Sequence, residues 1–82
     1  MDFPDALALA KTGAIIRRSG WNGKGMWVTV LTEVQPRELY GQFYETYPYL
    51  VMKAADGKLV IGWLASQTDL LSDDWELVEL AS

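Results

Sequence analysis

The segment at residues 26–32, Met-Trp-Val-Thr-Val-Leu-Thr, constrains the fold more than any other part of the chain. Its aromatic and β-branched side chains favour an extended strand. Because side chains alternate along a strand, the odd-numbered residues share one face and the even-numbered residues the other. Both faces are largely apolar, as in a strand that is covered on both sides. The sequence therefore predicts a β-sheet in which this strand is central or lies beneath an interface.

Shorter apolar runs supply the partners of this strand. Strands are predicted at residues 14–18, 49–54, 58–63 and 74–80. The second and third of these are joined through Ala55-Asp56-Gly57, and Asp-Gly between apolar runs is a strong hairpin signal. Consecutive strands joined by short turns pair antiparallel.

Two helical segments are predicted at the edges of this pattern. Asp2 can cap a helix that begins at Phe3-Pro4, and Gly13 is expected to end it. Residues 66–69, Ser-Gln-Thr-Asp, fit the pattern that caps a short helical turn. The predicted fold class is α+β: a small, mainly antiparallel β-sheet with an N-terminal helix and a short helical turn before the last strand. We expect one domain over residues 1–82.

Residues 33–47 interrupt the strand pattern with polar residues and four aromatic rings, Tyr40, Phe43, Tyr44 and Tyr47. A short helix and an aromatic-lined loop both fit this spacing. Irregular segments of this length are uncommon in small domains and often functional. The rings can equally fill a small core or form a contact between subunits.

The segment at residues 19–27, Ser-Gly-Trp-Asn-Gly-Lys-Gly-Met-Trp, holds the main candidate for binding chemistry. Glycines let backbone N–H groups approach a ligand closely. The indole of Trp21 offers a flat apolar face, and Lys24 a mobile positive charge suited to phosphate. The sequence predicts a small pocket for a flat, anionic molecule. The alternative is a tight turn in which Trp21 and Trp27 fill the core.

The chain contains no cysteine and no histidine. A disulfide framework, a thiolate metal site, a zinc hydrolase and a Ser-His-Asp enzyme are thereby excluded. We expect no metal, no cofactor and no catalytic residue.

Charge is distributed unevenly along the chain, whose net charge is −4. Residues 1–24 carry a net charge of +2, and residues 25–82 carry −6. The basic residues of the first part gather around the glycine-rich segment at residues 19–27, called the glycine loop below. An acidic body opposes nonspecific binding to nucleic-acid phosphates. This pattern favours a local anion site and predicts that DNA is not a partner.

Half of the 82 residues are apolar and four are tryptophan, which is rich for so short a chain. Because subunit interfaces bury aromatic and apolar surface, composition predicts a homo-oligomer. No run of about 18 apolar residues is present, so no membrane partner is expected. The N-terminus lacks the order of a signal peptide, so a cytoplasmic location is expected.

Several motifs occur together in a fixed order. They lie at residues 21–26, 48–49 with 51–53, 63–69 and 73–75. In this combination the chain resembles the phage-encoded Thoeris anti-defence family, the second of its named types, over nearly its whole length. Each motif is weak alone; four in order within 82 residues are specific as a set.

The resemblance implies a molecular sponge. Members of this family form homotetramers that sequester the nucleotide signal of the defence system, a glycocyclic isomer of ADP-ribose, in clefts between protomers without cleaving it. Some relatives also hold cyclic oligonucleotides of another anti-phage system. Deprived of its signal, the effector in the infected bacterial cytoplasm stays inactive.

Under this interpretation Trp21 stacks on the base and Asn22 reads a base edge or ribose. Backbone N–H groups of the glycine loop receive phosphate, which Lys24 or Arg18 neutralises. The polar residues 66–69 contact ribose, although Ser and Asp there can instead only cap a helical turn. The predicted ligand-binding residues are Arg18, Trp21, Asn22, Gly23, Lys24, Gly25, Ser66, Gln67, Thr68 and Asp69.

Two other function classes fit the sequence. One is a small enzyme that degrades the nucleotide with Asp69 or Asp74 as base, since carboxylates alone support glycosidic chemistry. The other is an oligomeric adaptor that blocks a host protein through the aromatic segment at residues 40–49.

Overall fold

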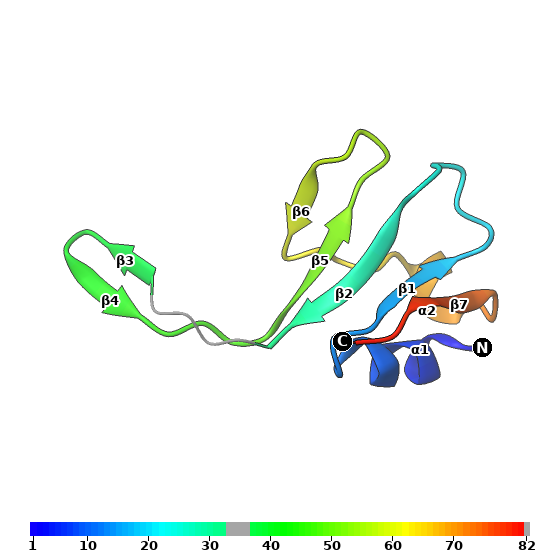
Figure 1. The fold of residues 1–82 in the computed structure, drawn as a ribbon, viewed down its shortest axis with the longest axis horizontal. Helices are drawn as coiled ribbons and strands as arrows, with labels where there is room; N and C mark the ends of the chain where they lie inside the picture. The colour runs from blue at the N-terminus through cyan, green and yellow to red at the C-terminus, as the bar shows by residue number, and fades with distance from the viewer. Residues whose placement is uncertain (33–36, 82) are drawn as a thin grey trace.

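An antiparallel five-stranded sheet forms the body of the molecule in the computed structural model, which describes residues 1–32 and 37–81 (Figure 1). Its strand order is β6-β5-β2-β1-β7. The strands are β1 (Ile15–Arg18), β2 (Trp27–Leu31), β5 (Tyr49–Lys53), β6 (Leu59–Ile61) and β7 (Trp75–Glu79). β2 is the middle strand of the five, so its predicted central position is confirmed. The α+β fold class is confirmed as well.

The N-terminal helix α1 (Phe3–Ala10) begins as predicted, because the Asp2 carboxylate accepts the backbone N–H of Asp5 at 3.0 Å. Its buried side chains are Phe3, Ala6 and Ala10, which pack the helix against β1, β2 and β7. Small residues on this face let the helix approach the sheet closely.

The core lies between α1 and the sheet. Strand register places the core residues of neighbouring strands side by side: Val28 of β2 lies opposite Ile16 of β1 and Met52 of β5. This explains the even-numbered apolar face of β2. The buried cluster contains Phe3, Ala6, Ala10, Ile16, Val28, Val30, Met52 and Trp75.

The second helix, α2 (Gln67–Leu71), precedes β7. Ser66 and Asp69 form a reciprocal capping box: the Ser66 hydroxyl accepts the Asp69 N–H at 3.1 Å, and the Asp69 carboxylate accepts the Ser66 N–H at 3.2 Å. The predicted cap is confirmed. It matters for the site, because it fixes the buried Asp69 side chain.

Residues 37–44 form neither a helix nor an irregular loop. They form a separate antiparallel hairpin of β3 (Arg37–Leu39) and β4 (Gln42–Tyr44). Tyr40 and Gly41 connect the two strands with φ values of +51° and +76°. Two consecutive positive φ values characterise the type I′ turn that closes tight hairpins, and glycine adopts this conformation without strain. Of the rest of the segment at residues 33–47, residues 45–47 have no regular secondary structure, and residues 33–36 lie outside the described residues.

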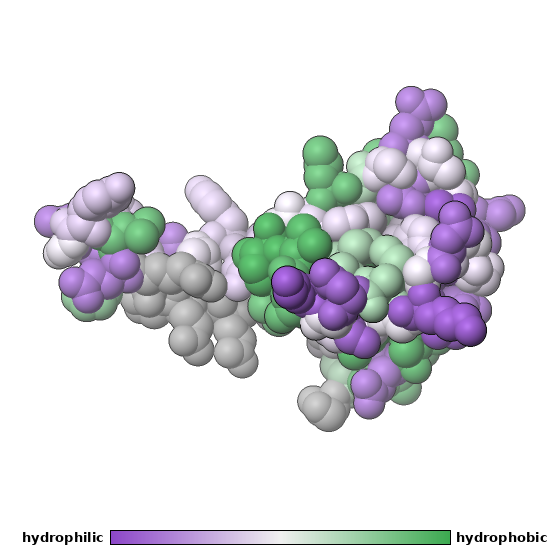
Figure 2. Space-filling view, turned by 90° about the horizontal axis from the view of Figure 1, so that it is seen from above, coloured by the Kyte–Doolittle hydropathy of each residue, from purple (hydrophilic) through white to green (hydrophobic). Residues whose placement is uncertain are grey.

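This hairpin projects from the body as an arm (Figure 1), and the molecule extends 44 Å along its longest axis. Figure 2 shows the arm set apart from the body, with hydrophobic side chains at the surface of both. Among the described residues, no helix is both long and apolar enough to cross a membrane.

Isoleucine truncation tests where the core lies. Ile16 is fully buried, whereas Ile61 on β6 is 59 % exposed. Ile16→Val removes one buried methyl group and is expected to lower the free energy of unfolding by about 0.5–1.5 kcal/mol. The matched change Ile61→Val is expected to stay within about 0.5 kcal/mol. Urea unfolding of both variants measures the difference, and equal losses would contradict this placement of the core.

Candidate functional site

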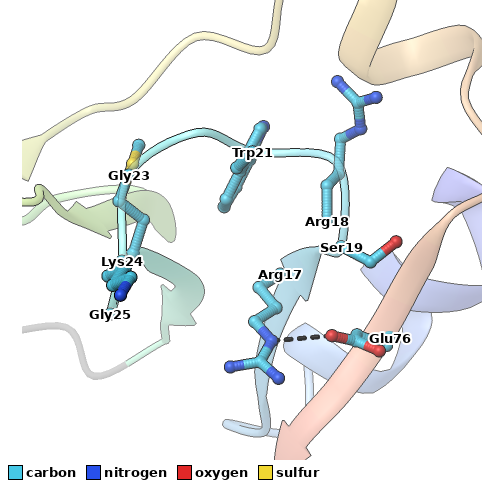
Figure 3. A pocket seen from close by; sticks show the side chains of 9 residues that line it. Arg17, Arg18, Ser19, Trp21, Gly23, Lys24, Gly25 and Glu76 are labelled. Atoms are coloured by element: carbon cyan, nitrogen blue, oxygen red, sulfur yellow. Dashed lines mark hydrogen bonds and ion pairs between the residues drawn. The ribbon is translucent and has the colours of Figure 1, made fainter.

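The loop between β1 and β2 borders a polar pocket of about 340 Å³. β1 and the adjacent β7 contribute one wall and the loop contributes the other (Figure 3). The lining residues are Arg17, Arg18, Ser19, Trp21, Gly23, Lys24, Gly25, Met26 and Glu76. Five of the predicted ligand-binding residues are therefore brought together here: Arg18, Trp21, Gly23, Lys24 and Gly25.

Arg18 lies at the pocket but directs its guanidinium away from Arg17 and Lys24 (Figure 3). It is held by two carboxylates. Nη1 donates to Asp69 Oδ1 at 2.9 Å, and Nε and Nη2 donate to the two oxygens of Asp74 at 2.8 and 3.3 Å. Only 14 % of the Arg18 side chain is exposed. The contact with Asp74 is bidentate, and both ion pairs are largely buried. They are structural contacts that join β1 to α2 and to the start of β7.

Asp74 also holds the beginning of the loop. Its Oδ2 accepts the Gly20 N–H at 2.9 Å, and its backbone carbonyl accepts the Ser19 N–H at 3.1 Å. A Cβ at Gly20 would lie 2.6 Å from the same carboxylate oxygen. A side chain at residue 20 would therefore displace the Asp74 carboxylate from its present contacts, and glycine avoids this.

The charges of this cluster stabilise one another. Hydrogen bonds to Asp74 and then to Asp69 raise the pKa of Arg18 above its ordinary value. Burial by itself would raise the pKa of Asp69, but hydrogen bonds from Trp21, Arg18 and Ser66 outweigh it and lower that pKa. The hydrogen bond from Arg18 is the main reason that the pKa of Asp74 is lowered. Both carboxylates are therefore ionised at neutral pH and engaged with donors.

Trp21 has both a structural contact and a place at the pocket. Its indole Nε1 donates to Asp69 Oδ1 at 3.1 Å, and its ring meets Trp75 edge-on with centroids 5.3 Å apart. Trp63 adds a second edge-on contact at 6.1 Å. The remaining surface of the ring lines the pocket. Both interpretations of Trp21, core residue and pocket wall, thus apply to the same side chain.

The cations that face the pocket are Arg17 and Lys24 (Figure 3). Lys24 is exposed. Arg17 Nε donates to Glu76 at 2.7 Å, but about half of each side chain is exposed, and such surface pairs contribute little stability. An anion can therefore draw Arg17 away from Glu76 at small cost.

Sequence reasoning missed four of the lining residues, Arg17, Ser19, Met26 and Glu76. The alternation of Arg17 and Arg18 along β1 does indicate that one arginine faces the site. The choice between them depends on where Asp69 and Asp74 lie, and no local pattern reveals it. Glu76 carries no sequence signal at all, because it reaches the pocket only through the pairing of β7 with β1.

The predicted residues outside this lining are Asn22 and the group at residues 66–69. Asn22 is exposed on the loop, and Ser66, Gln67 and Thr68 are exposed at the start of α2. Asp69 is buried behind Trp21. The loop and α2 touch within one chain, through the hydrogen bond from Trp21 to Asp69. Ligand contacts by these residues stay a prediction.

Comparison with known proteins identifies the family of this chain. The chain matches the family described as Thoeris anti-defense 2-like domain over residues 1–78. It is also 34 % identical, over 85 aligned residues, to Thoeris anti-defense 2 of Bacillus phage SP01. That alignment covers 95 % of this chain and 94 % of the phage protein.

The family match and this relative support a phage anti-defence role. The chain belongs to the Thoeris anti-defense 2-like family, as its motifs predicted.

Removing the Asp69 charge tests the ion-pair cluster. Asp69→Asn keeps the shape but weakens the bonds from Arg18 and Trp21, so the free energy of unfolding at neutral pH is expected to fall by about 1–3 kcal/mol. The exposed change Asp73→Asn is the control and is expected to stay within about 0.5 kcal/mol.

The same pair of variants tests the pH dependence. Since folding lowers the pKa of Asp69 below its ordinary 3.8, its contribution is complete above that pH and is lost as pH falls through the folded value. Acid unfolding below pH 3.8 should therefore be less steep in Asp69→Asn than in Asp73→Asn. Identical acid profiles would show that Asp69 is not stabilised by this cluster.

Proposed function

We propose that this protein binds a cyclic nucleotide signal, the glycocyclic isomer of ADP-ribose, and sequesters it without cleavage. Acting in the cytoplasm of the infected bacterium, it keeps the Thoeris effector inactive. The observation that carries the proposal is the pocket in which two cations and a glycine-rich backbone lie beside the Trp21 ring, in a chain of this family.

The chemistry of the pocket matches the parts of such a ligand. Arg17 and Lys24 supply positive charge for the pyrophosphate, with arginine suited to a bidentate contact. The backbone around Gly25, which has a φ of +74°, offers N–H groups without a side chain in the way. Base stacking on an aromatic ring contributes about 1–3 kcal/mol, and the pocket side of Trp21 provides such a surface.

The exposed residues Asn22, Ser66, Gln67 and Thr68 are proposed as contacts at the edge of the site, to a base edge or to ribose hydroxyls. We propose that the protein acts as a homo-oligomer, expected to be a tetramer, with ligand held in clefts between protomers. Its many exposed apolar side chains support this assembly. DNA is not proposed as a partner.

A non-catalytic role is supported by the state of the candidate bases. Asp69 and Asp74 both accept hydrogen bonds from Arg18. The pKa of Asp74 is lowered mainly by this bond, and the pKa of Asp69 is lowered because hydrogen bonds from Trp21, Arg18 and Ser66 outweigh its burial. A carboxylate with a lowered pKa and occupied acceptor sites is a poor proton acceptor. Sequestration needs only affinity and slow release.

The first experiment is a calorimetric titration with glycocyclic ADP-ribose, followed by mass analysis of the ligand released by heating the complex. We expect tight binding, a raised melting temperature and an unchanged ligand mass. A changed ligand mass would show that the protein acts on the nucleotide as an enzyme and does not only sequester it. Absence of binding would overturn the proposal that glycocyclic ADP-ribose is the ligand. The same titration with cyclic oligonucleotides then tests whether these are the ligand instead.

Charge removal in the pocket tests the site. Arg17→Gln and Lys24→Gln each remove a cation from the proposed phosphate contact, and each is expected to weaken binding by about tenfold or more. Lys11→Gln is the control, because it removes the same kind of charge from the end of α1, outside the lining of this pocket. If the control weakens binding as much as the pocket variants, the effect is general electrostatics and the pocket is not the site.

A further inference from the structure

Trp27 differs from the other tryptophans of the chain in its surroundings. Trp21, Trp63 and Trp75 contact one another edge-on beside the core. Trp27 is half-buried and lies outside the core cluster, and its indole makes no hydrogen bond or ring contact with any described residue. Tryptophan is highly buried on average in folded proteins. A partly exposed indole with an unused N–H donor is therefore a candidate ligand contact.

The alternation of β2 explains why Trp27 stays outside the core. It lies on the odd-numbered face of β2, opposite to the face on which Val28 and Val30 join the core. Both helices lie on the core side, because α1 packs against the sheet there and α2 contacts α1 and accepts the indole N–H of the core residue Trp75. Among the described elements, no helix packs on the face that carries Trp27, which is called the open face below.

Two cations flank Trp27 on the open face. In the antiparallel pairing of β1 with β2, Ile16 lies opposite Val28, so the next pair brings Arg17 beside Trp27. On the other side, the register of β2 with β5 places Lys53 directly opposite Trp27. Opposite residues of antiparallel strands point to the same face. Arg17, Trp27 and Lys53 thus form a row across three adjacent strands, with the aromatic ring between two positive charges.

This row is continuous with the pocket of the glycine loop. Arg17 belongs to both, since it also lines the pocket together with Lys24 and Gly25 (Figure 3). Lys53 reaches the end of the loop that precedes β2, where its Nζ donates to the Gly25 carbonyl oxygen at 3.4 Å. A hydrogen bond of this length is weak, and an ammonium has three donors. Lys53 can therefore bind a phosphate without a large loss of protein contacts.

The row matches the parts of one nucleotide. A base can stack on the flat indole, and the cations beside it can neutralise phosphate. Neighbouring strands lie about 4.8 Å apart, so the backbones that carry Arg17 and Lys53 are separated by about 10 Å, which is within the span of a single nucleotide.

Trp21 and Trp27 are alternative stacking surfaces for the base, since a ligand with a single base stacks on one ring. Trp21 is already engaged: its indole N–H is bonded to Asp69, and two other tryptophans contact its ring. Trp27 has no such contacts with the described residues. These contacts favour Trp27 as the ring that receives the base.

We propose that the nucleotide site extends from the pocket onto the open face of the sheet, where the base stacks on Trp27. Lys53 joins Arg17 and Lys24 at the phosphates, and Trp21 remains a wall of the pocket. This inference rests on the proposed function, because it assigns the parts of the same ligand to residues. It can fail while sequestration stands, since the variants below test single contacts.

The first test is a calorimetric titration of the unmodified protein and three variants with glycocyclic ADP-ribose. Trp27→Leu removes the flat ring and is expected to weaken binding by at least about fivefold, the loss of one stacking contact. Trp27→Phe keeps an aromatic ring and is expected to retain most of the affinity. Leu31→Ala is the control, because it removes exposed apolar surface from the same face of the same strand. Circular dichroism should show all variants folded.

Tryptophan fluorescence then identifies the stacking ring, because a stacked base quenches the emission of an indole. The ligand is expected to quench the unmodified protein and Trp21→Phe. Quenching is expected to be largely lost in Trp27→Phe, although this variant still binds. A merely structural role of Trp27 would leave quenching intact in Trp27→Phe. If Trp21→Phe does not fold, the Trp27→Phe result decides alone.

Lys53→Gln tests the added cation. Loss of a phosphate contact is expected to weaken binding by about tenfold and to make the affinity less dependent on salt concentration. Lys11→Gln removes a lysine outside both the row and the pocket, and it is expected to bind like the unmodified protein.

Four outcomes would overturn the proposal. If the unmodified protein binds and Trp27→Leu loses no more affinity than Leu31→Ala, the base lies elsewhere and sequestration stands. Quenching that survives in Trp27→Phe and is lost in Trp21→Phe assigns the base to Trp21. Normal binding by Lys53→Gln removes Lys53 from the site. An unmodified protein that binds neither glycocyclic ADP-ribose nor cyclic oligonucleotides overturns the proposed function, and this inference with it.

Discussion

The fold and the candidate site both depend on the ion pairs of Arg18. One guanidinium binds Asp69 of α2 and Asp74 before β7, so it ties together segments that are more than fifty residues from it in the chain. The same two carboxylates accept the Trp21 indole N–H and the Gly20 backbone N–H. Across residues 1–32 and 37–81, no buried side-chain nitrogen or oxygen lacks a hydrogen-bond partner. Removing either acid would leave a partly buried cation with fewer partners.

This arrangement gives the glycine loop two sides with different roles. On the side of α2, Arg18 and Trp21 are held by hydrogen bonds and by edge-on contacts with other tryptophans. On the pocket side, Lys24 is exposed and Arg17 is held only by an exposed ion pair. The proposed binding site therefore has a rigid wall and adaptable charges, and a rigid wall limits the entropy lost on binding. Stability and binding can then be changed separately by mutation.

The arm follows from the size of the chain. A body of this size has room for a small core, so much of its apolar surface remains outside. The rings of the arm lie on a hairpin that projects from the body, while an apolar cleft stays open beside its base. The anti-defence family to which the chain belongs supplies the biological setting.

Local sequence determined most of the elements and their order. The apolar run at residues 26–32 specified a central strand, Asp-Gly specified the hairpin that follows β5, and Ser66 with Asp69 specified a helix cap, because these signals act within a few residues. Tertiary structure decided the rest. Whether Arg17 or Arg18 points to the pocket depends on carboxylates that reach β1 only when α2 and β7 pack beside it. The hairpin at residues 37–44 likewise required strand pairing that its aromatic spacing did not reveal, since side chains exposed on both faces leave no periodic pattern.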